Sequence, residues 1–146
     1  MKILIVEDDD GNRLLTYLEL SEEKQWDIIT ASNGKEAMHL FVKELPDIVT
    51  LDIELPDISG SSLIREMKKN RPEIPIIILT GYDYHPDVSE ADDYIVKTLS
   101  CGEELRKSIK RLVPAESHSS LYTGKAVQDA DSKGFSAENR ADRDSA

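Results

Sequence analysis

The chain has 146 residues, enough for one domain with one sizeable core, and its 39% hydrophobic and 32% charged residues are typical of a soluble globular protein. Its formal net charge of −11 disfavours a general nucleic-acid surface, because phosphate backbones attract clusters of Lys and Arg. A single cysteine, Cys101, predicts no internal disulfide. The apolar start of only four residues is too short for a signal peptide or a membrane span, so we expect a cytoplasmic protein.

Short apolar runs alternate along the chain with segments of helical periodicity. The predicted strands are Ile3–Val6, Asp27–Ala31, Ile48–Leu51, Ile76–Leu79 and Tyr94–Val96. The apolar stripes of the predicted helices lie within 14–18, 37–41, 63–67 and 105–112. Three of the runs are nearly continuous in Ile, Leu and Val, as expected for strands that are buried on both faces. This alternation predicts an α/β fold with a parallel sheet and helices on both faces.

Start and stop signals agree with these elements. Asn33 with Glu36, and Ser100 with Glu103, have the spacing of a capping box. From about Ala115 the periodic pattern stops, and large apolar residues become too sparse to offset the entropy of ordering the chain. We therefore expect a domain over residues 1–114 and a disordered polar tail over 115–146. A short docking segment near residues 121–122 is an alternative for part of the tail.

Polar side chains follow four of the predicted strands. They are Glu7 and Asp8 after the first, Asp52 after the third, Thr80 after the fourth and Lys97 after the fifth. In a parallel sheet these groups converge on one edge, where clustered carboxylates repel one another unless a hard cation such as Mg2+ binds them. A carboxylate nucleophile, a metal, an ammonium and a hydroxyl suit phosphoryl transfer. Asp9 and Asp10 are expected to favour the positive N-terminal end of the next helix.

Four motifs accompany these strand ends in order. They are residues 3–9 (ILIVEDD), 52–60 (DIELPDISG), 76–81 (IIILTG) and 91–97 (ADDYIVK). Together they resemble response-regulator receiver domains, which have an acidic pair, an Asp-x-x-[Met/Leu]-Pro-x-x-x-Gly phosphoacceptor segment, a switch hydroxyl, and a switch aromatic followed by a lysine. The resemblance covers residues 2 to about 113. It implies a flavodoxin-like, doubly wound five-stranded sheet in the order 2-1-3-4-5.

The resemblance also implies a role for each matched residue. Asp52 would accept a phosphoryl group from a histidine kinase or phosphotransfer protein. Glu7, Asp8, Asp52 and the Glu54 backbone carbonyl would hold Mg2+, Thr80 and Lys97 would bind the phosphoryl oxygens, and Tyr94 would be the rotating aromatic. The output would be a protein target, with no nucleic acid or membrane partner. We expect no catalysis beyond the protein's own phosphorylation and dephosphorylation.

Two features depart from the family pattern. Receivers usually have a proline after the lysine, often with a cis bond, whereas Lys97 precedes Thr98 here. A cis bond to a non-proline residue costs about 2.5–4 kcal/mol, so we expect a trans bond. In addition, only residues 81–92 connect the fourth and fifth strands, and Pro86 interrupts them. We therefore expect a fourth helix of about one or two turns at most.

Two other functions remain open from the sequence. A haloacid-dehalogenase-like phosphatase also uses an aspartate, Mg2+, a Thr or Ser and a Lys, but it has its nucleophile after the first strand in an Asp-x-Asp motif. Here Asp52 follows the third strand, with Glu54 two positions later. A receiver-like module that binds partners without phosphorylation is the second alternative, suggested by Thr98 and the short segment 81–92. Phosphorylation by acetyl phosphate would argue against this second alternative, whereas turnover of generic phosphoesters would support the phosphatase.

Overall fold

The computed structural model describes residues 1–81, 89–98 and 101–115. The chain divides into two compact units, Met1–Leu112 and Val113–Ala146, and the helices and strands named below belong to the first. Two predictions fall mainly outside the described residues, namely the disorder of the tail and the short helix between the fourth and fifth strands. Of that connection, residues 89–92 contain a turn and no helix.

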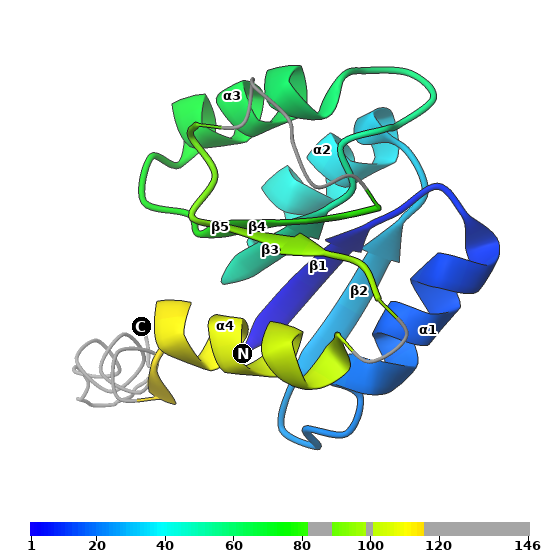
Figure 1. The fold of residues 1–146 in the computed structure, drawn as a ribbon. Helices are drawn as coiled ribbons and strands as arrows, with labels where there is room; N and C mark the ends of the chain where they lie inside the picture. The colour runs from blue at the N-terminus through cyan, green and yellow to red at the C-terminus, as the bar shows by residue number, and fades with distance from the viewer. Residues whose placement is uncertain (82–88, 99–100, 116–146) are drawn as a thin grey trace, which may run out of the picture. The chain divides into compact units, whose positions relative to one another are not determined.

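Five parallel strands form one sheet in the predicted order β2-β1-β3-β4-β5 (Figure 1). The strands are β1 (Lys2–Val6), β2 (Asp27–Ala31), β3 (Ile48–Leu51), β4 (Ile76–Thr80) and β5 (Asp93–Val96). The helices within the described ranges are α1 (Asp10–Leu20), α2 (Gly34–Glu44), α3 (Gly60–Asn70) and α4 (Gly102–Leu112). α2 and α3 cover one face of the sheet, and α1 and α4 cover the other (Figure 1). The flavodoxin-like fold is confirmed.

Side chains of the central strands alternate between the two faces, as the pleat requires. Leu4 and Val6 of β1 join the cluster that includes Phe41 of α2, whereas Ile3 and Ile5 are buried on the side of α1 and α4. Both faces are therefore apolar, which explains the nearly continuous runs of Ile, Leu and Val in the sequence. None of the helices in the described ranges is both long and apolar enough to cross a membrane.

Side-chain caps begin three of the helices. Asp9 caps α1, Asn33 caps α2 and Ser59 caps α3, and each accepts the backbone N–H three residues later, at 2.8, 2.8 and 3.2 Å. These caps confirm the capping signal at Asn33 and the prediction that Asp9 belongs to the start of the first helix. Ser100, the other predicted cap, lies outside the described residues.

An ion pair links α4 to β5. Asp93 accepts a hydrogen bond from the hydroxyl of Ser108 and another, of 2.8 Å, from Nη2 of Arg111. Partial burial raises the pKa of Asp93, but the hydrogen bonds from Ser108 and from the Tyr94 amide, with the charge of Arg111, outweigh it. The pKa of Asp93 therefore lies below its ordinary value.

Asp93→Asn should lower the free energy of unfolding by about 1 kcal/mol at pH 7, because it weakens a charge-assisted contact that is only partly buried. Since the folded pKa is lowered, this stabilisation is present above the unfolded pKa of about 3.9 and is lost as pH falls through the folded value. Urea denaturation at pH 7 and pH 3 measures the effect. The difference between wild type and variant should shrink at pH 3, and an equal difference at both values would contradict the account.

Candidate functional site

Backbone hydrogen bonds place the residues that follow the strands at one edge of the sheet. The amide of Glu7 donates to the end of β2 at 3.0 Å, and the amide of Asp52 donates to the end of β1 at 3.0 Å. The amide of Lys97 donates to the carbonyl of Thr80 at 2.7 Å. Pairing thus continues one residue beyond these strands. The sheet itself brings together side chains that are up to 90 positions apart in sequence.

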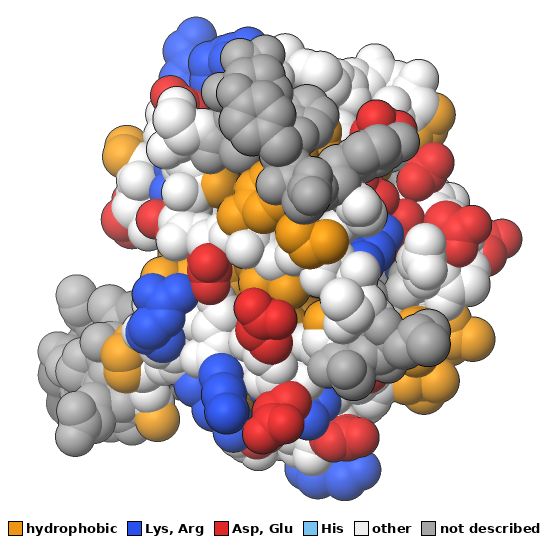
Figure 2. All heavy atoms as spheres, in the orientation of Figure 1, with side chains coloured by type: hydrophobic (Ala, Val, Ile, Leu, Met, Phe, Trp, Pro, Cys, Tyr) orange, Lys and Arg blue, Asp and Glu red, His pale blue; other side chains and the backbone are white. Residues whose placement is uncertain are grey.

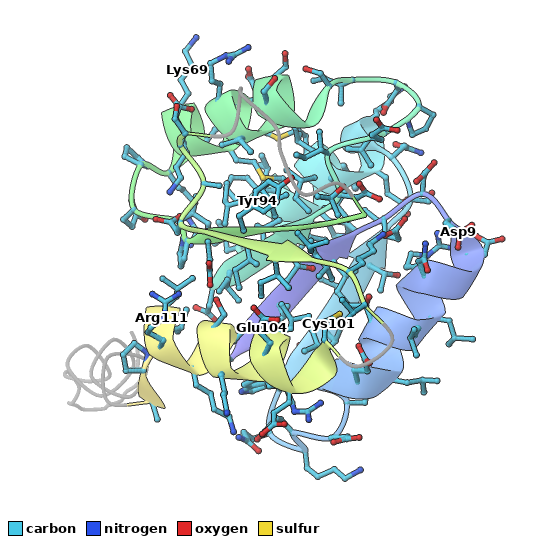
Figure 3. The ribbon with its side chains drawn as sticks, in the orientation of Figure 1. Asp9, Lys69, Tyr94, Cys101, Glu104 and Arg111 are labelled. Carbon is cyan, nitrogen blue, oxygen red and sulfur yellow. The ribbon has the colours of Figure 1, made fainter. Side chains whose placement is uncertain are left out.

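Three carboxylates and one ammonium gather at this edge. Glu7, Asp8 and Asp52 each offer an oxygen, and these atoms lie within 4.8 Å of one another. Glu7 is buried, Asp52 is half-buried and Asp8 is exposed. Nζ of Lys97 donates to Oε1 of Glu7 at 2.5 Å and to Oδ2 of Asp52 at 3.2 Å. Figure 2 shows further acidic side chains at the end of the molecule where α1 begins, which Asp9 marks in Figure 3.

Burial and charge act in opposite directions within this cluster. Burial raises the pKa of Glu7 above its ordinary value, and the charge of Asp52 adds to this effect, while the hydrogen bond from Lys97 opposes it. Burial lowers the pKa of Lys97, but its hydrogen bond to Glu7 and the charge of Asp52 outweigh burial and raise it above the ordinary value. Lys97 therefore stays cationic near neutral pH, although it is one cation against three carboxylates.

Thr80 ends β4 with a buried hydroxyl. The residue is fully buried, and Oγ1 makes no hydrogen bond within the described part of the chain. Leaving a buried hydroxyl unsatisfied costs about 1–3 kcal/mol. The atom is thus a donor available to an acceptor that enters the site.

The loop after β3 folds tightly around Asp52. Oδ1 of Asp52 accepts the amide of Glu54 at 3.1 Å, and the carbonyl of Ile53 accepts the amide of Gly60 at 2.9 Å. Glu54 also forms an isolated antiparallel bridge with Ser59. A Cβ atom at Gly60 would lie 2.7 Å from Cα of Ile53, so only glycine permits this closure. These backbone contacts therefore hold Glu54, a predicted metal ligand, in a fixed position relative to Asp52.

The two remaining sequence predictions concern β5 and the bond that follows Lys97. Tyr94 is half-buried and packs against the core cluster on the side of the sheet that α2 and α3 cover (Figure 3). The Lys97–Thr98 bond is trans as predicted, since the described residues contain no cis peptide bond. Lys97 nevertheless reaches both Glu7 and Asp52. The absence of the usual proline does not keep the lysine out of the cluster.

Two residues that the sequence analysis did not single out support the edges of the site. Nη1 of Arg13 donates to the carbonyl of Glu7 at 2.9 Å, and Nη2 pairs with Asp10 at 2.5 Å. Asp57, in the loop after β3, accepts hydrogen bonds from the first two amides of α2. Arg13 lies one helical turn beyond Asp9, and from the sequence alone it is indistinguishable from an ordinary residue on the surface of a helix. The partners of Asp57 are more than 20 positions away, so no local spacing could indicate them.

The fold and the acidic edge together define a class of protein, the receiver-type flavodoxin-like α/β domain. Comparison with known families agrees with this class. The family model for the response regulator receiver domain matches residues 3–110, and the chain belongs to this family.

Curated relatives are longer than this chain. The probable transcriptional regulator ycf27 of Guillardia theta is 36% identical over 133 residues, which cover 84% of this chain and 50% of that protein. The transcriptional regulatory protein TcrX of Mycobacterium tuberculosis, named as probable, is 31% identical over 140 residues, which cover 89% of this chain and 59% of that protein. The chain thus spans about half the length of the curated relatives it matches.

Solved structures include receivers with bound ligands and partners. The response regulator TrrA of Thermotoga maritima, in complex with Mg2+-BeF, aligns with a TM-score of 0.71 and 40% identity over 76% of this chain and 97% of that chain. TrrA in complex with the histidine kinase ThkA aligns with a TM-score of 0.69 and 37% identity over 77% of this chain and 97% of that chain.

Proposed function

We propose that this chain is a phosphorylation-dependent signalling switch of a two-component system or phosphorelay. In this proposal, Asp52 accepts a phosphoryl group from the phosphohistidine of a histidine kinase or phosphotransfer protein. The main supporting observation is the ion pair of 3.2 Å between Asp52 and Lys97 within a cluster of two further carboxylates. The similarity to TrrA, which was crystallised with Mg2+-BeF and with a histidine kinase, also supports the proposal.

The acidic cluster fits a divalent cation, because three carboxylates and one ammonium leave a local charge of −2. Asp8 and Asp52 reach solvent and would hold Mg2+ directly, with the Glu54 backbone carbonyl. Glu7 is buried, unlike Asp8 and Asp52, and it accepts the hydrogen bond from Lys97, so it would contribute through a water. When bound, Mg2+ neutralises charge that develops on the phosphoryl oxygens.

The proposed transfer exchanges one bond to phosphorus for another. A carboxylate oxygen of Asp52 forms a bond to phosphorus while the N–P bond of the phosphohistidine breaks, and that electron pair remains on the imidazole nitrogen. Lys97 then exchanges its contact with Asp52 for a phosphoryl oxygen, and the Thr80 hydroxyl donates to another. The product carries a charge of about −2 on the phosphoryl group.

This added charge would shift an equilibrium between inactive and active conformations. A change from 1:99 to 99:1 requires about 5.5 kcal/mol of differential stabilisation. One lysine contact and one hydroxyl contact, reduced by desolvation, supply less than this amount. We therefore infer a partial shift that partner binding completes, with Tyr94 as the aromatic that moves.

Incubation with acetyl phosphate and Mg2+ tests the proposal. Intact-mass spectrometry should show a gain of about 80 Da, the mass of one phosphoryl group, in the wild-type chain. Asp52→Asn should show no gain, because the amide is not a nucleophile for this transfer. A wild-type chain that gains no mass would instead support the receiver-like module that works without phosphorylation.

The phosphoryl donor must cover the rim of the site, since Asp52 is half-buried. α1 begins at this rim, and its outer side exposes Leu14 and Leu18, which are 57% and 55% exposed and one turn apart. Figure 2 shows hydrophobic side chains on this outer side of α1. Exposed apolar patches beside a site are typical of protein interfaces. We place the docking surface of the histidine-bearing partner on α1, at Leu14 and Leu18.

The double variant Leu14→Ser/Leu18→Ser should lower the rate of phosphotransfer by about tenfold or more, because each side chain would lose apolar contact with the partner. The assay uses the histidine kinase that phosphorylates the wild-type chain fastest in a panel. Phosphorylation by acetyl phosphate should be unchanged, since that donor needs no docking surface. Val42→Ser on α2 is the matched control, because Val42 is equally exposed at 59%. Equal loss in the control would contradict the docking surface.

The output of the switch cannot be taken from the longer relatives. The relatives named as transcriptional regulators match this chain over about half of their length, so their DNA-directed output is not carried over to it. Its net charge of −11 favours a protein target over nucleic acid. We propose that residues 1–114 act in the cytoplasm as this switch, with 115–146 as a tail outside it, and that no reaction is catalysed beyond its own phosphorylation and dephosphorylation.

A further inference from the structure

The loop between β3 and α3, residues 52–60, is attached to the domain at two places. At its base, the hydrogen bonds from Glu54 to Asp52 and from Gly60 to Ile53 close the loop around the predicted acceptor. At its outer tip, Asp57 contacts a different element, the first turn of α2. The outer contact has no part in the chemistry proposed above.

The outer contact is specific in geometry. Oδ1 of Asp57 accepts the amide of Gly34 at 2.8 Å, and Oδ2 accepts the amide of Lys35 at 2.9 Å. The hydrogen bonds from Gly34 and Lys35 hold the pKa of Asp57 below its ordinary value, so the carboxylate is charged at neutral pH. Both oxygens of one side chain are thus fixed on a helix 22 and 23 positions away in sequence.

The contact between Asp57 and α2 is possible only because residue 34 is glycine, since Ile58 lies against it. A Cβ atom at Gly34 would lie 2.1 Å from Cγ2 of Ile58, so any larger residue would push the loop away from the helix. Ile58 in turn packs against the core cluster. α2 is packed tightly against the sheet, because Ala37 and Phe41 on its sheet-facing side are fully buried.

The helix has a second side-chain acceptor at its start besides Asp57. Asn33 is the N-cap of α2 and already accepts the amide three residues later. Of the two amides that donate to Asp57, the amide of Lys35 belongs to an exposed residue, whereas Gly34 is buried and its amide has Asp57 as acceptor. The contact also holds the loop, because Asp57 is an exposed residue at the tip of the segment that carries Asp52 and Glu54.

We propose that Asp57 is a positioning residue for the segment that carries Asp52 and Glu54. Only two residues separate Glu54 from Asp57, so release of the tip from α2 would let the Glu54 carbonyl move relative to the carboxylate of Asp52. This inference rests on the proposed metal site. Its expected effect is on metal affinity, because ligands that are not held in position bind metal more weakly.

Mn2+ binding, followed by electron paramagnetic resonance without any phosphoryl donor, tests the inference. Mn2+ takes carboxylate and carbonyl oxygens as Mg2+ does. Asp57→Ala should raise the Kd for Mn2+ by about tenfold. The matched control is Asn33→Ala, which removes a cap from the same helix turn but does not touch the loop. Both variants should lower Tm by about 2–6 °C, and Asn33→Ala should leave the Kd within about twofold of wild type.

A second pair of variants tests the same contact without removing a charge. Gly34→Ala should weaken Mn2+ binding as Asp57→Ala does, because its Cβ would displace Ile58. Adding Ile58→Ala removes the atom at 2.1 Å, so the double variant Gly34→Ala/Ile58→Ala should bind Mn2+ with the Kd of Ile58→Ala alone. Failure of the second substitution to restore affinity would contradict displacement of the loop as the cause.

The outcomes separate this inference from the proposed function. A wild-type chain that does not bind Mn2+ would overturn both. If wild type binds Mn2+ and accepts a phosphoryl group but Asp57→Ala has the same Kd, only the positioning role of Asp57 is overturned. Equal weakening by Asp57→Ala and Asn33→Ala would also overturn it, because the effect would then follow from loss of stability in α2.

Discussion

Lys97→Met should lower the free energy of unfolding in EDTA at pH 7 by about 3 kcal/mol, measured by urea denaturation. The reason is that Lys97 is the cation of the cluster, and its loss leaves the buried carboxylate of Glu7 without a charged partner. The folded pKa of Glu7, already raised by burial, would rise further. A raised folded pKa of an acid means that stability is present at low pH and lost as pH rises through that value. The deficit of the variant should therefore shrink as the solution is acidified.

The same substitution should slow phosphorylation by acetyl phosphate by about 100-fold, because one fixed charge on the phosphoryl oxygens is lost. Asp8→Asn serves as a control, because it should change stability in the opposite direction. Removing one of three mutually repelling carboxylates should raise Tm in EDTA by about 2–4 °C, and Mg2+ should cancel the gain. If Lys97→Met were as stable as wild type, or if Asp8→Asn lowered Tm, the close approach of these charges would be contradicted.

Thr80→Val should stabilise the unphosphorylated protein by about 1–2 kcal/mol, because a methyl group of similar size replaces a fully buried hydroxyl that has no hydrogen-bond partner among the residues the structure describes. In the phosphorylated protein this gain should disappear, since the hydroxyl would then donate to a phosphoryl oxygen. Urea denaturation of both forms measures the difference. Thr80→Ser keeps the hydroxyl and should not stabilise the unphosphorylated form.

A stabilisation by Thr80→Val that is equal in both forms would mean that the hydroxyl never meets the phosphoryl group. Thr80 would then be a tolerated strand-end residue. A loss of stability in the unphosphorylated form would instead show that Oγ1 finds a partner there, which would remove the physical reason for a role in the switch.

The α/β architecture could be predicted from the sequence because helices cover both faces of the sheet. Apolar runs then have to be continuous, and the polar residues that end them, such as Asp52 and Lys97, have to meet at one edge. The strand order was predictable only through resemblance to the family. Hydrophobic pattern does not determine which buried strands are neighbours.

The finer features of the site depend on contacts between distant segments. The chain shows that Thr98 replaces a proline, but only the structure shows that Lys97 still reaches Glu7 and Asp52. The contact of Asp57 with α2 depends on the absence of a side chain at Gly34, which has no local signal in the sequence. The Thr80 hydroxyl, which has no hydrogen-bond partner within the described ranges, likewise depends on packing that the sequence does not show.

Localising the phosphoryl group within the chain tests the central claim most directly. After phosphorylation with acetyl phosphate and Mg2+, borohydride reduction converts an aspartyl phosphate to homoserine, and peptide mass mapping locates the altered residue. We expect homoserine at position 52 and at no other aspartate, and a labelling rate that falls in EDTA. Modification at Asp8 or another acidic residue, or none at position 52 while the intact chain gains mass, would contradict it.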